Sequence, residues 1–148
     1  DRTKSRGLGD VYKRQYNTLH DLGYAHSIEV WEHNKLKGGL YGVAVGKVFF
    51  AESMFSTSSN GSKLALIALM GTLALNQFLL LDVQFMTNHL KTMGAKEISR
   101  ALFLNLIKKS SSEKVEFNEP SSAIIDEMLV NKAEMKSLVG ISKLKHQI

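Results

Sequence analysis

Apolar and polar residues alternate over 26–33, which predicts a strand, and two further strands separated by turns follow, so an antiparallel sheet is expected in the first third of the chain. Asn34 suits the positive φ of a tight turn between the first two strands. The paired Gly38 and Gly39 interrupt the second strand, which indicates a bulge or the close approach of another backbone or a ligand. A short helix ending at Gly23 is expected before the sheet. The helix is expected over 11–22, and the strands over 26–33, 36–45 and 47–55.

Apolar spacing then changes to that of helices and short strands. Positions 62–75 are almost all apolar or small, which predicts a largely buried helix. Ser99 is the expected N-cap of a later helix that ends near residue 109. Together these elements predict an α/β (α+β) fold with a mixed, mostly antiparallel sheet flanked by helices. The remaining expected elements are a strand at 78–83, a helix at 87–93, strands at 95–98 and 115–117, and a helical tail after Pro120.

The run 64–81 also permits a different interpretation. Its eighteen residues contain only Asn76 and Gln77 as strongly polar positions, and Lys63 and Asp82 flank it. This length is close to the lower limit for a membrane-spanning helix. The polar pair and the change in composition favour a buried helix followed by a buried strand, but the membrane-associated alternative stays open.

Composition narrows the function classes. Cysteine is absent, which excludes disulfides, thiolate zinc sites and cysteine nucleophiles, and which fits a cytoplasmic protein. The net charge is +5, of which +3 lies in residues 1–15, so the rest of the chain is too weakly basic to imply nucleic-acid binding. We interpret 1–15 as a non-native leader, 16–120 as one domain and 121–148 as an uncertain helical tail.

Two acidic positions are candidates for chemistry. Asp82 ends an apolar run, and Gln84 follows two positions later, so both side chains would share one face of a strand. A plain alternative is a strand-end aspartate that caps the next loop. Glu52 lies between apolar residues of a strand, where a carboxylate is costly unless paired or exposed. The five histidines lack metal-binding spacing, so no metal site is expected.

The ordered motifs HSIEVW, GGLYGV, ESMFS and DVQ resemble the leucyl/phenylalanyl-tRNA–protein transferase family. The resemblance runs from about Tyr16 to Ile107. It implies a GNAT-like acyltransferase fold. It also implies transfer of Leu or Phe, and less well Met, from aminoacyl-tRNA to proteins with N-terminal Arg or Lys, which marks them for degradation in the bacterial N-degron pathway. No cofactor or metal is implied.

The resemblance also assigns roles to residues. Gln84 would orient the acceptor amine, Asp82 would polarise Gln84, and Glu52 would meet the aminoacyl amine or the cationic acceptor. An apolar pocket would select the transferred side chain, although plain core packing is the alternative for its members. The pocket residues would be Leu40, Phe49, Met54, Leu66, Leu69, Leu73 and Leu81.

One departure from the family concerns length, because nothing here corresponds to the N-terminal domain that helps hold the tRNA. We leave open whether the chain alone is active. Two other functions remain: a GNAT acetyltransferase using acetyl-CoA, although residues 58–63 miss its usual pyrophosphate loop, and a non-catalytic membrane-associated protein built around 64–81.

Overall fold

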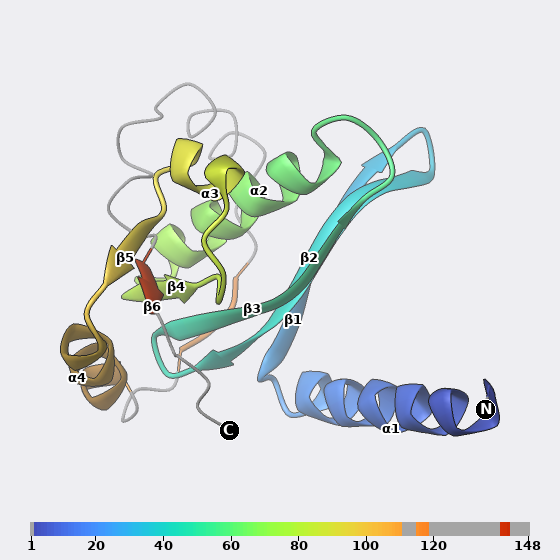
Figure 1. The fold of residues 1–148 in the computed structure, drawn as a ribbon, viewed down its shortest axis with the longest axis horizontal. Helices are drawn as coiled ribbons and strands as arrows, with labels where there is room; N and C mark the ends of the chain where they lie inside the picture. Colours follow the sequence, from blue (N-terminus) through green and yellow to red (C-terminus); the bar gives the residue numbers. More distant parts are fainter. Residues whose placement is uncertain (1, 111–114, 119–139, 143–148) are drawn as a thin grey trace.

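A four-stranded sheet in the order β1-β2-β3-β4 organises the computed structural model (Figure 1), which describes residues 2–110, 115–118 and 140–142. The first three strands form an antiparallel meander, and β4 joins β3 in parallel. This confirms the expected mostly antiparallel, mixed sheet. The strands are β1 (Ala25–Glu32), β2 (Lys35–Val45), β3 (Val48–Ser56) and β4 (Leu80–Asp82).

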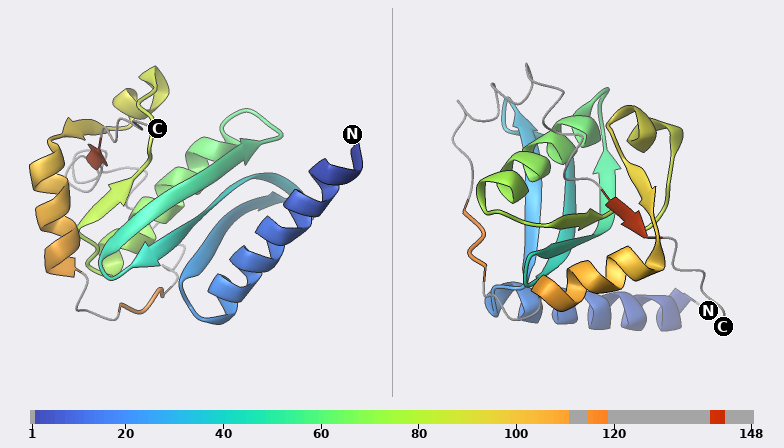
Figure 2. Two further views of the ribbon diagram at one scale, coloured as in Figure 1. Left: turned by 60° about the horizontal axis from the view of Figure 1, so that its bottom comes forward. Right: turned by 90° about the vertical axis from the view of Figure 1, so that its left-hand side faces the viewer.

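Helices cover both faces of this sheet. One face packs against α2, and α1 and α4 lie on the opposite side (Figures 1 and 2). Phe50 of β3 meets Phe103 of α4 edge-on, with ring centroids 6.4 Å apart. A second sheet pairs β5 with β6 in parallel. The bounds are α1 (Arg2–Asp21), α2 (Gly61–Leu75), α3 (Asn88–Thr92), α4 (Arg100–Ser110), β5 (Lys96–Ile98) and β6 (Gly140–Ser142).

Local signals end or begin several elements as the sequence predicts. Gly23 follows α1 with a φ of 79°, and Asn34 has a φ of 59° in the β1–β2 turn. The Thr87 hydroxyl accepts a hydrogen bond from the Leu90 N–H at 3.1 Å and caps α3. Ser99 accepts from the Leu102 N–H at 3.2 Å at the start of α4. These caps satisfy N–H groups that have no partner inside a helix.

Other expectations were wrong. The first helix begins at Arg2 instead of residue 11. The strand expected at 78–83 shrinks to β4, because the Phe78 N–H still bonds to the Leu73 carbonyl of α2 and the chain turns at Gln84 with a φ of 61°. Residues 115–117 form no strand. The membrane-span alternative fails because α2 ends at Leu75. Within the described ranges, no helix is both long and apolar enough to cross a bilayer. The expected tail helix falls outside the described residues, apart from 140–142.

The glycines of β2 allow α2 to begin directly against the strand. A Cβ on Gly38 would lie 2.4 Å from the Gly61 carbonyl carbon, and a Cβ on Gly61 would lie 2.1 Å from the Lys37 carbonyl oxygen. The pairing of β1 with β2 also shifts at this point, which leaves Lys37 as an extra residue. The predicted bulge and close backbone approach are therefore both confirmed.

A short segment after α4 closes one side of the core. The Phe117 ring stacks on the His26 ring at 3.9 Å and lies 5.8 Å from the Phe49 ring. The side chain of Asn76 donates to the Asn118 carbonyl at 2.9 Å and accepts from the Asn118 N–H at 3.2 Å. Residues 115–118 thus contact the end of α2 through Asn76 and β1 through His26, without strand pairing.

Substituting Gly61 with alanine tests the close approach of α2 and β2. Helix propensity alone would make Gly61→Ala stabilising by up to about 1 kcal/mol. The contact with the Lys37 carbonyl predicts the opposite sign, a loss of about 1–3 kcal/mol, because the backbone must move. Urea unfolding measures the difference. Gly23→Ala, where a Cβ meets nothing within 4 Å, measures separately the cost of a positive φ, which Gly61→Ala does not incur. An unchanged or raised midpoint for Gly61→Ala would contradict the packing.

The stack of His26 on Phe117 predicts a pH dependence of stability. Burial is the main cause that lowers the pKa of His26 below 6.5; the Gly23 carbonyl acts in the opposite direction, and His20 adds to the lowering. His26 has a lower pKa in the folded chain than in the unfolded chain, where it is about 6.5. The contribution of neutral His26 to folding stability is therefore complete above about pH 6.5 and is lost as the pH falls through the folded-state pKa. Thermal unfolding from pH 7.5 to 5 should therefore show a smaller decline in His26→Phe than in the unsubstituted chain. Parallel curves would contradict this.

Candidate active site

A β-bulge in β3 places Glu52 outside the regular ladder. Tyr41 of β2 pairs with Ser53, and the next residue, Gly42, pairs with Ala51, so Glu52 has no opposite residue. A bulge redirects a side chain without changing the pairing on either side. Glu52 is exposed, so its carboxylate avoids the cost of burial.

The redirected carboxylate meets an aromatic pair. Tyr16 of α1 lies next to Glu52, whose charge and acceptor oxygens act on its phenol, and the Tyr16 ring packs edge-on against that of Tyr41, with centroids 5.0 Å apart and planes at 77°. Desolvation, followed by the charge and hydrogen bond of Glu52, raises the pKa of Tyr16 to about 12. The phenol therefore remains a neutral donor at physiological pH.

A cavity of about 420 Å³ lies beside this cluster, between α1 and the start of β1. Tyr16 and Tyr41 are both part of its wall, and His20 closes one side, with its Nδ1 2.9 Å from the Ala25 carbonyl. The other lining residues are Tyr12, Lys13, Asn17, Ala25, His26 and Ser27. The wall is mostly apolar with a few polar groups, as is usual for a small-ligand site.

Asp82 ends β4 and is buried, with 3% of its surface exposed. Its Oδ1 accepts a hydrogen bond from the main-chain N–H of Gln84 at 2.9 Å. This is the turn-capping geometry that was the plain alternative for Asp82. A buried carboxylate held in this way fixes the backbone immediately after the strand.

The expectation that Asp82 and Gln84 share one strand face is wrong, because β4 stops at Asp82. Gln84 is instead the central residue of a γ-turn: its φ is 61°, and the Phe85 N–H donates to the Val83 carbonyl at 2.6 Å. A positive φ at this position of a γ-turn is rare and strained for a residue with a side chain. Strain of this kind is concentrated at functional sites. The turn leaves the Gln84 side chain exposed.

The sheet separates the polar candidates from the apolar ones. Leu81 pairs with Phe49, and both belong to the core that α2 covers, whereas Asp82 pairs with Phe50 on the opposite face. Glu52, through its bond to Tyr16 of α1, lies on that opposite side as well. The structure therefore brings Glu52 and Asp82 to one face, two residues apart in the β3 register.

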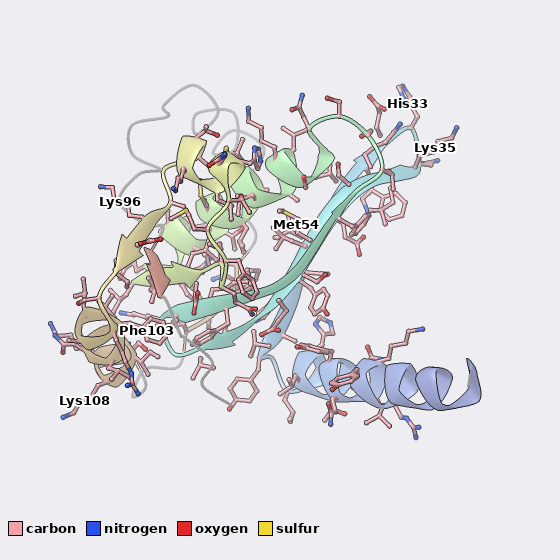
Figure 3. All side chains as sticks on the ribbon, viewed as in Figure 1. His33, Lys35, Met54, Lys96, Phe103 and Lys108 are labelled. Atoms are coloured by element: carbon pink, nitrogen blue, oxygen red, sulfur yellow. The ribbon has the colours of Figure 1, made fainter. Side chains whose placement is uncertain are left out.

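Most of the residues expected to form an apolar pocket are packed core. Met54 is the exception: 42% of its surface is exposed, and Figure 3 shows it on the side of β3 that faces α2. The other six, each at most 4% exposed, are Leu40, Phe49, Leu66, Leu69, Leu73 and Leu81. They surround one another in a single cluster. Their expected role as a pocket stays a prediction, and Met54 is the member that a ligand can reach directly.

No group of three histidines, aspartates or glutamates lies close enough to hold a metal ion within the part of the chain that the structure describes. The chemical groups gathered here are carboxylates, an amide and phenols. Such a set can orient an amine, accept its proton or hold a cation.

Comparison with known proteins gives this arrangement a context. The sequence profile of the family described as "Leucyl/phenylalanyl-tRNA protein transferase" matches residues 4–108. The chain belongs to this family. Curated members with the name leucyl/phenylalanyl-tRNA–protein transferase are similar to it, and that of Syntrophobacter fumaroxidans is 51% identical over 100 residues, 68% of this chain and 43% of the relative.

Two further relatives show the same extent of similarity. The chain is 56% identical to the transferase of Zymomonas mobilis over 97 residues, 66% of the chain and 36% of the relative. It is 55% identical to that of Syntrophus aciditrophicus over 103 residues, 70% of the chain and 43% of the relative. The chain thus spans less than half the length of these transferases.

Sequence reasoning named Glu52, Asp82 and Gln84 but missed the partner of Glu52. Neither Tyr16 nor Tyr41 was among the candidate site residues. An unpaired residue in a bulge leaves no mark in a single sequence, so the direction of Glu52 could not be foreseen. The one available signal was an acidic residue on an apolar strand, which requires either exposure or a partner.

The γ-turn of this transferase-family chain predicts an ordering of two variants. Gln84→Ala and Gln84→Gly both remove the amide, but glycine adopts a positive φ without the steric cost that alanine retains. We expect Gln84→Gly to be about 1 kcal/mol more stable than Gln84→Ala in urea unfolding. Equal stabilities would contradict the strained turn. The corresponding pair at Lys91, an exposed position inside α3, is the control and should show the reverse order.

Proposed function

We propose that the protein containing this chain is an aminoacyltransferase that moves Leu or Phe, and less well Met, from aminoacyl-tRNA to the N-terminus of an acceptor protein. The acceptor carries Arg or Lys as its first residue, and the product is marked for degradation by the bacterial N-degron pathway, in the cytoplasm. The proposal rests on one observation above the others, the family match over residues 4–108.

The proposed reaction is aminolysis of an ester. The acceptor α-amine attacks the aminoacyl carbonyl carbon, the new C–N bond replaces the bond to the terminal ribose oxygen, and the amine proton ends on that oxygen. The reaction is already favourable, so holding the amine against the carbonyl supplies much of the acceleration. No metal, cofactor or free nucleotide takes part in this scheme.

In this proposal Gln84 accepts a hydrogen bond from the acceptor amine through its side-chain carbonyl. Asp82 acts on Gln84 by a different route from the one expected from the sequence: its Oδ1 holds the Gln84 main-chain N–H at 2.9 Å and so fixes the strained turn. Because Gln84 is exposed, an incoming amine can reach it without movement of the core. Asp82 is therefore a positioning residue, and Gln84 is the catalytic one.

The proposed GNAT-like fold is supported by the order of elements. An antiparallel meander leads into the buried helix α2, and a strand then joins the last strand of the meander in parallel. The paired part ends at Phe50 and Asp82, and β3 continues for six residues beyond it. The parallel pair therefore opens beside Glu52 and the Gln84 turn, which is where we place the reacting groups.

The proposed activity is tested by transfer of labelled Phe from Phe-tRNA to a peptide with N-terminal Arg. Both the chain itself and the longest open reading frame that contains it should be assayed. We expect Gln84→Ala and Asp82→Ala to lower turnover by about tenfold to a hundredfold, the size of loss that follows misplacement of reacting groups. Binding of tRNA should change much less. Unchanged turnover in both variants would overturn the assigned roles.

A matched control addresses folding. Asn88→Ala changes the first residue of α3, outside the proposed reacting groups, and should retain turnover. Melting curves of all three variants separate a loss of fold from a loss of chemistry. Transfer of an acetyl group from acetyl-CoA, with no transfer of Phe, would favour the acetyltransferase alternative instead.

A further inference from the structure

Two phenol rings and a carboxylate meet where α1 crosses the sheet, and the proposed reaction leaves the phenols without a role. Tyr16 comes from α1, Tyr41 from β2 and Glu52 from the bulge of β3, so three separate elements converge on one point. The cavity of about 420 Å³ opens beside the two rings.

An exposed glutamate is ordinarily mobile. Its long side chain loses up to about 2 kcal/mol of rotamer entropy when it is held in one conformation. In this chain the bulge sets the direction of Glu52, and the Tyr16 hydroxyl supplies a donor at its carboxylate. The edge-on contact with Tyr41 restricts the orientation of the Tyr16 ring that carries this donor.

The chemistry of the donor matters for what Glu52 can bind. A lysine or arginine in the place of Tyr16 would neutralise the carboxylate, whereas a phenol orients it and leaves its negative charge intact. The raised pKa of Tyr16, about 12, keeps the phenol in the donating form. A carboxylate has about four acceptor sites, so one bond from Tyr16 leaves capacity for a cation.

We propose that Tyr16 is a positioning residue that holds the Glu52 carboxylate ready to receive the cationic first residue of the acceptor, its guanidinium or ammonium group. This inference rests on the proposed function, because that function supplies an acceptor beginning with Arg or Lys. It adds a role for a helix residue that precedes the sheet, and it makes the docking of α1 on β1 and β2 part of acceptor recognition.

The first test is binding of peptides to the chain, with no transfer required. The probes are a peptide beginning with Arg and the same peptide beginning with Ser, measured by calorimetry. We expect Glu52→Gln to remove most of the preference for Arg, about tenfold, which corresponds to about 1.4 kcal/mol. Tyr16→Phe, which keeps the ring, should reduce the preference about three- to tenfold, the loss expected when one ordinary hydrogen bond is removed.

Combining Tyr16→Phe with Glu52→Gln shows whether Tyr16 affects the preference for Arg through Glu52 or independently of it. If Tyr16 acts through Glu52, the double variant should bind as Glu52→Gln does alone. Tyr24→Phe is the matched control, since it removes a phenol hydroxyl from a half-exposed tyrosine outside the cluster, and it should leave the preference unchanged. A preference in Tyr16→Phe equal to that of the unsubstituted chain, additive losses, or no initial preference for Arg would each overturn the proposal.

A spectroscopic titration checks the link between the two residues directly. In the unsubstituted chain one tyrosine should ionise only near pH 12, and in Glu52→Gln it should titrate closer to 10, because both the negative charge and the strong acceptor are lost. An unaltered titration would overturn the proposal. If peptides bind as expected but no form of the protein transfers Phe from tRNA, the transferase proposal fails and the positioning role stands.

Discussion

The requirement to cover α2 on more than one side determines how the rest of the chain is arranged. Its buried residues include Ala65, Ile67, Leu69 and Thr72, which do not lie on one narrow stripe. A helix that is apolar around much of its circumference must be enclosed, since each exposed apolar side chain forfeits about 1.5–3 kcal/mol. The sheet covers one side of α2, and Phe78, Leu90 and Phe117 extend the same core. The glycine contact at Gly38 and Gly61 sets how closely helix and strand approach.

This arrangement leaves the proposed reacting groups on the other face of the sheet and at its open end. The core supplies a rigid support, while the bulge of β3 and the turn after β4 direct Glu52 and Gln84 outward. The bulge and the turn both depart from regular structure. Tyr16 lies against Glu52 at the bulge, and Asp82 accepts the hydrogen bond of the Gln84 main-chain N–H at the turn. The polar groups thus gain fixed directions without being buried in the apolar layer.

The elements were predictable where local chemistry determines them. Alternation over 26–33 and the turns that follow it predicted the meander, and Ser99 and Gly23 marked helix ends, because capping and positive φ depend on residues close in sequence. The strand at 78–83 was overestimated because an apolar run cannot report the turns at Gln77 and Gln84. The Phe117 stack and the Tyr16–Glu52 bond join residues far apart in the chain, and a single sequence contains no record of such contacts. Six of the seven residues expected to form an apolar pocket lie in the packed core, and their burial depends on how α2 packs against the sheet, which the sequence does not show.

Because of the bulge, the pairing of β2 with β3 does not depend on the presence of Glu52. Since Glu52 occupies no ladder position, Ala51 and Ser53 already lie opposite neighbouring residues of β2, Gly42 and Tyr41. A version of the strand one residue shorter could keep every other side chain of β3 on its present face. The meander is therefore a scaffold that can gain or lose this carboxylate as a single insertion, so the proposed recognition of a charged partner can change while the packing beneath it stays the same.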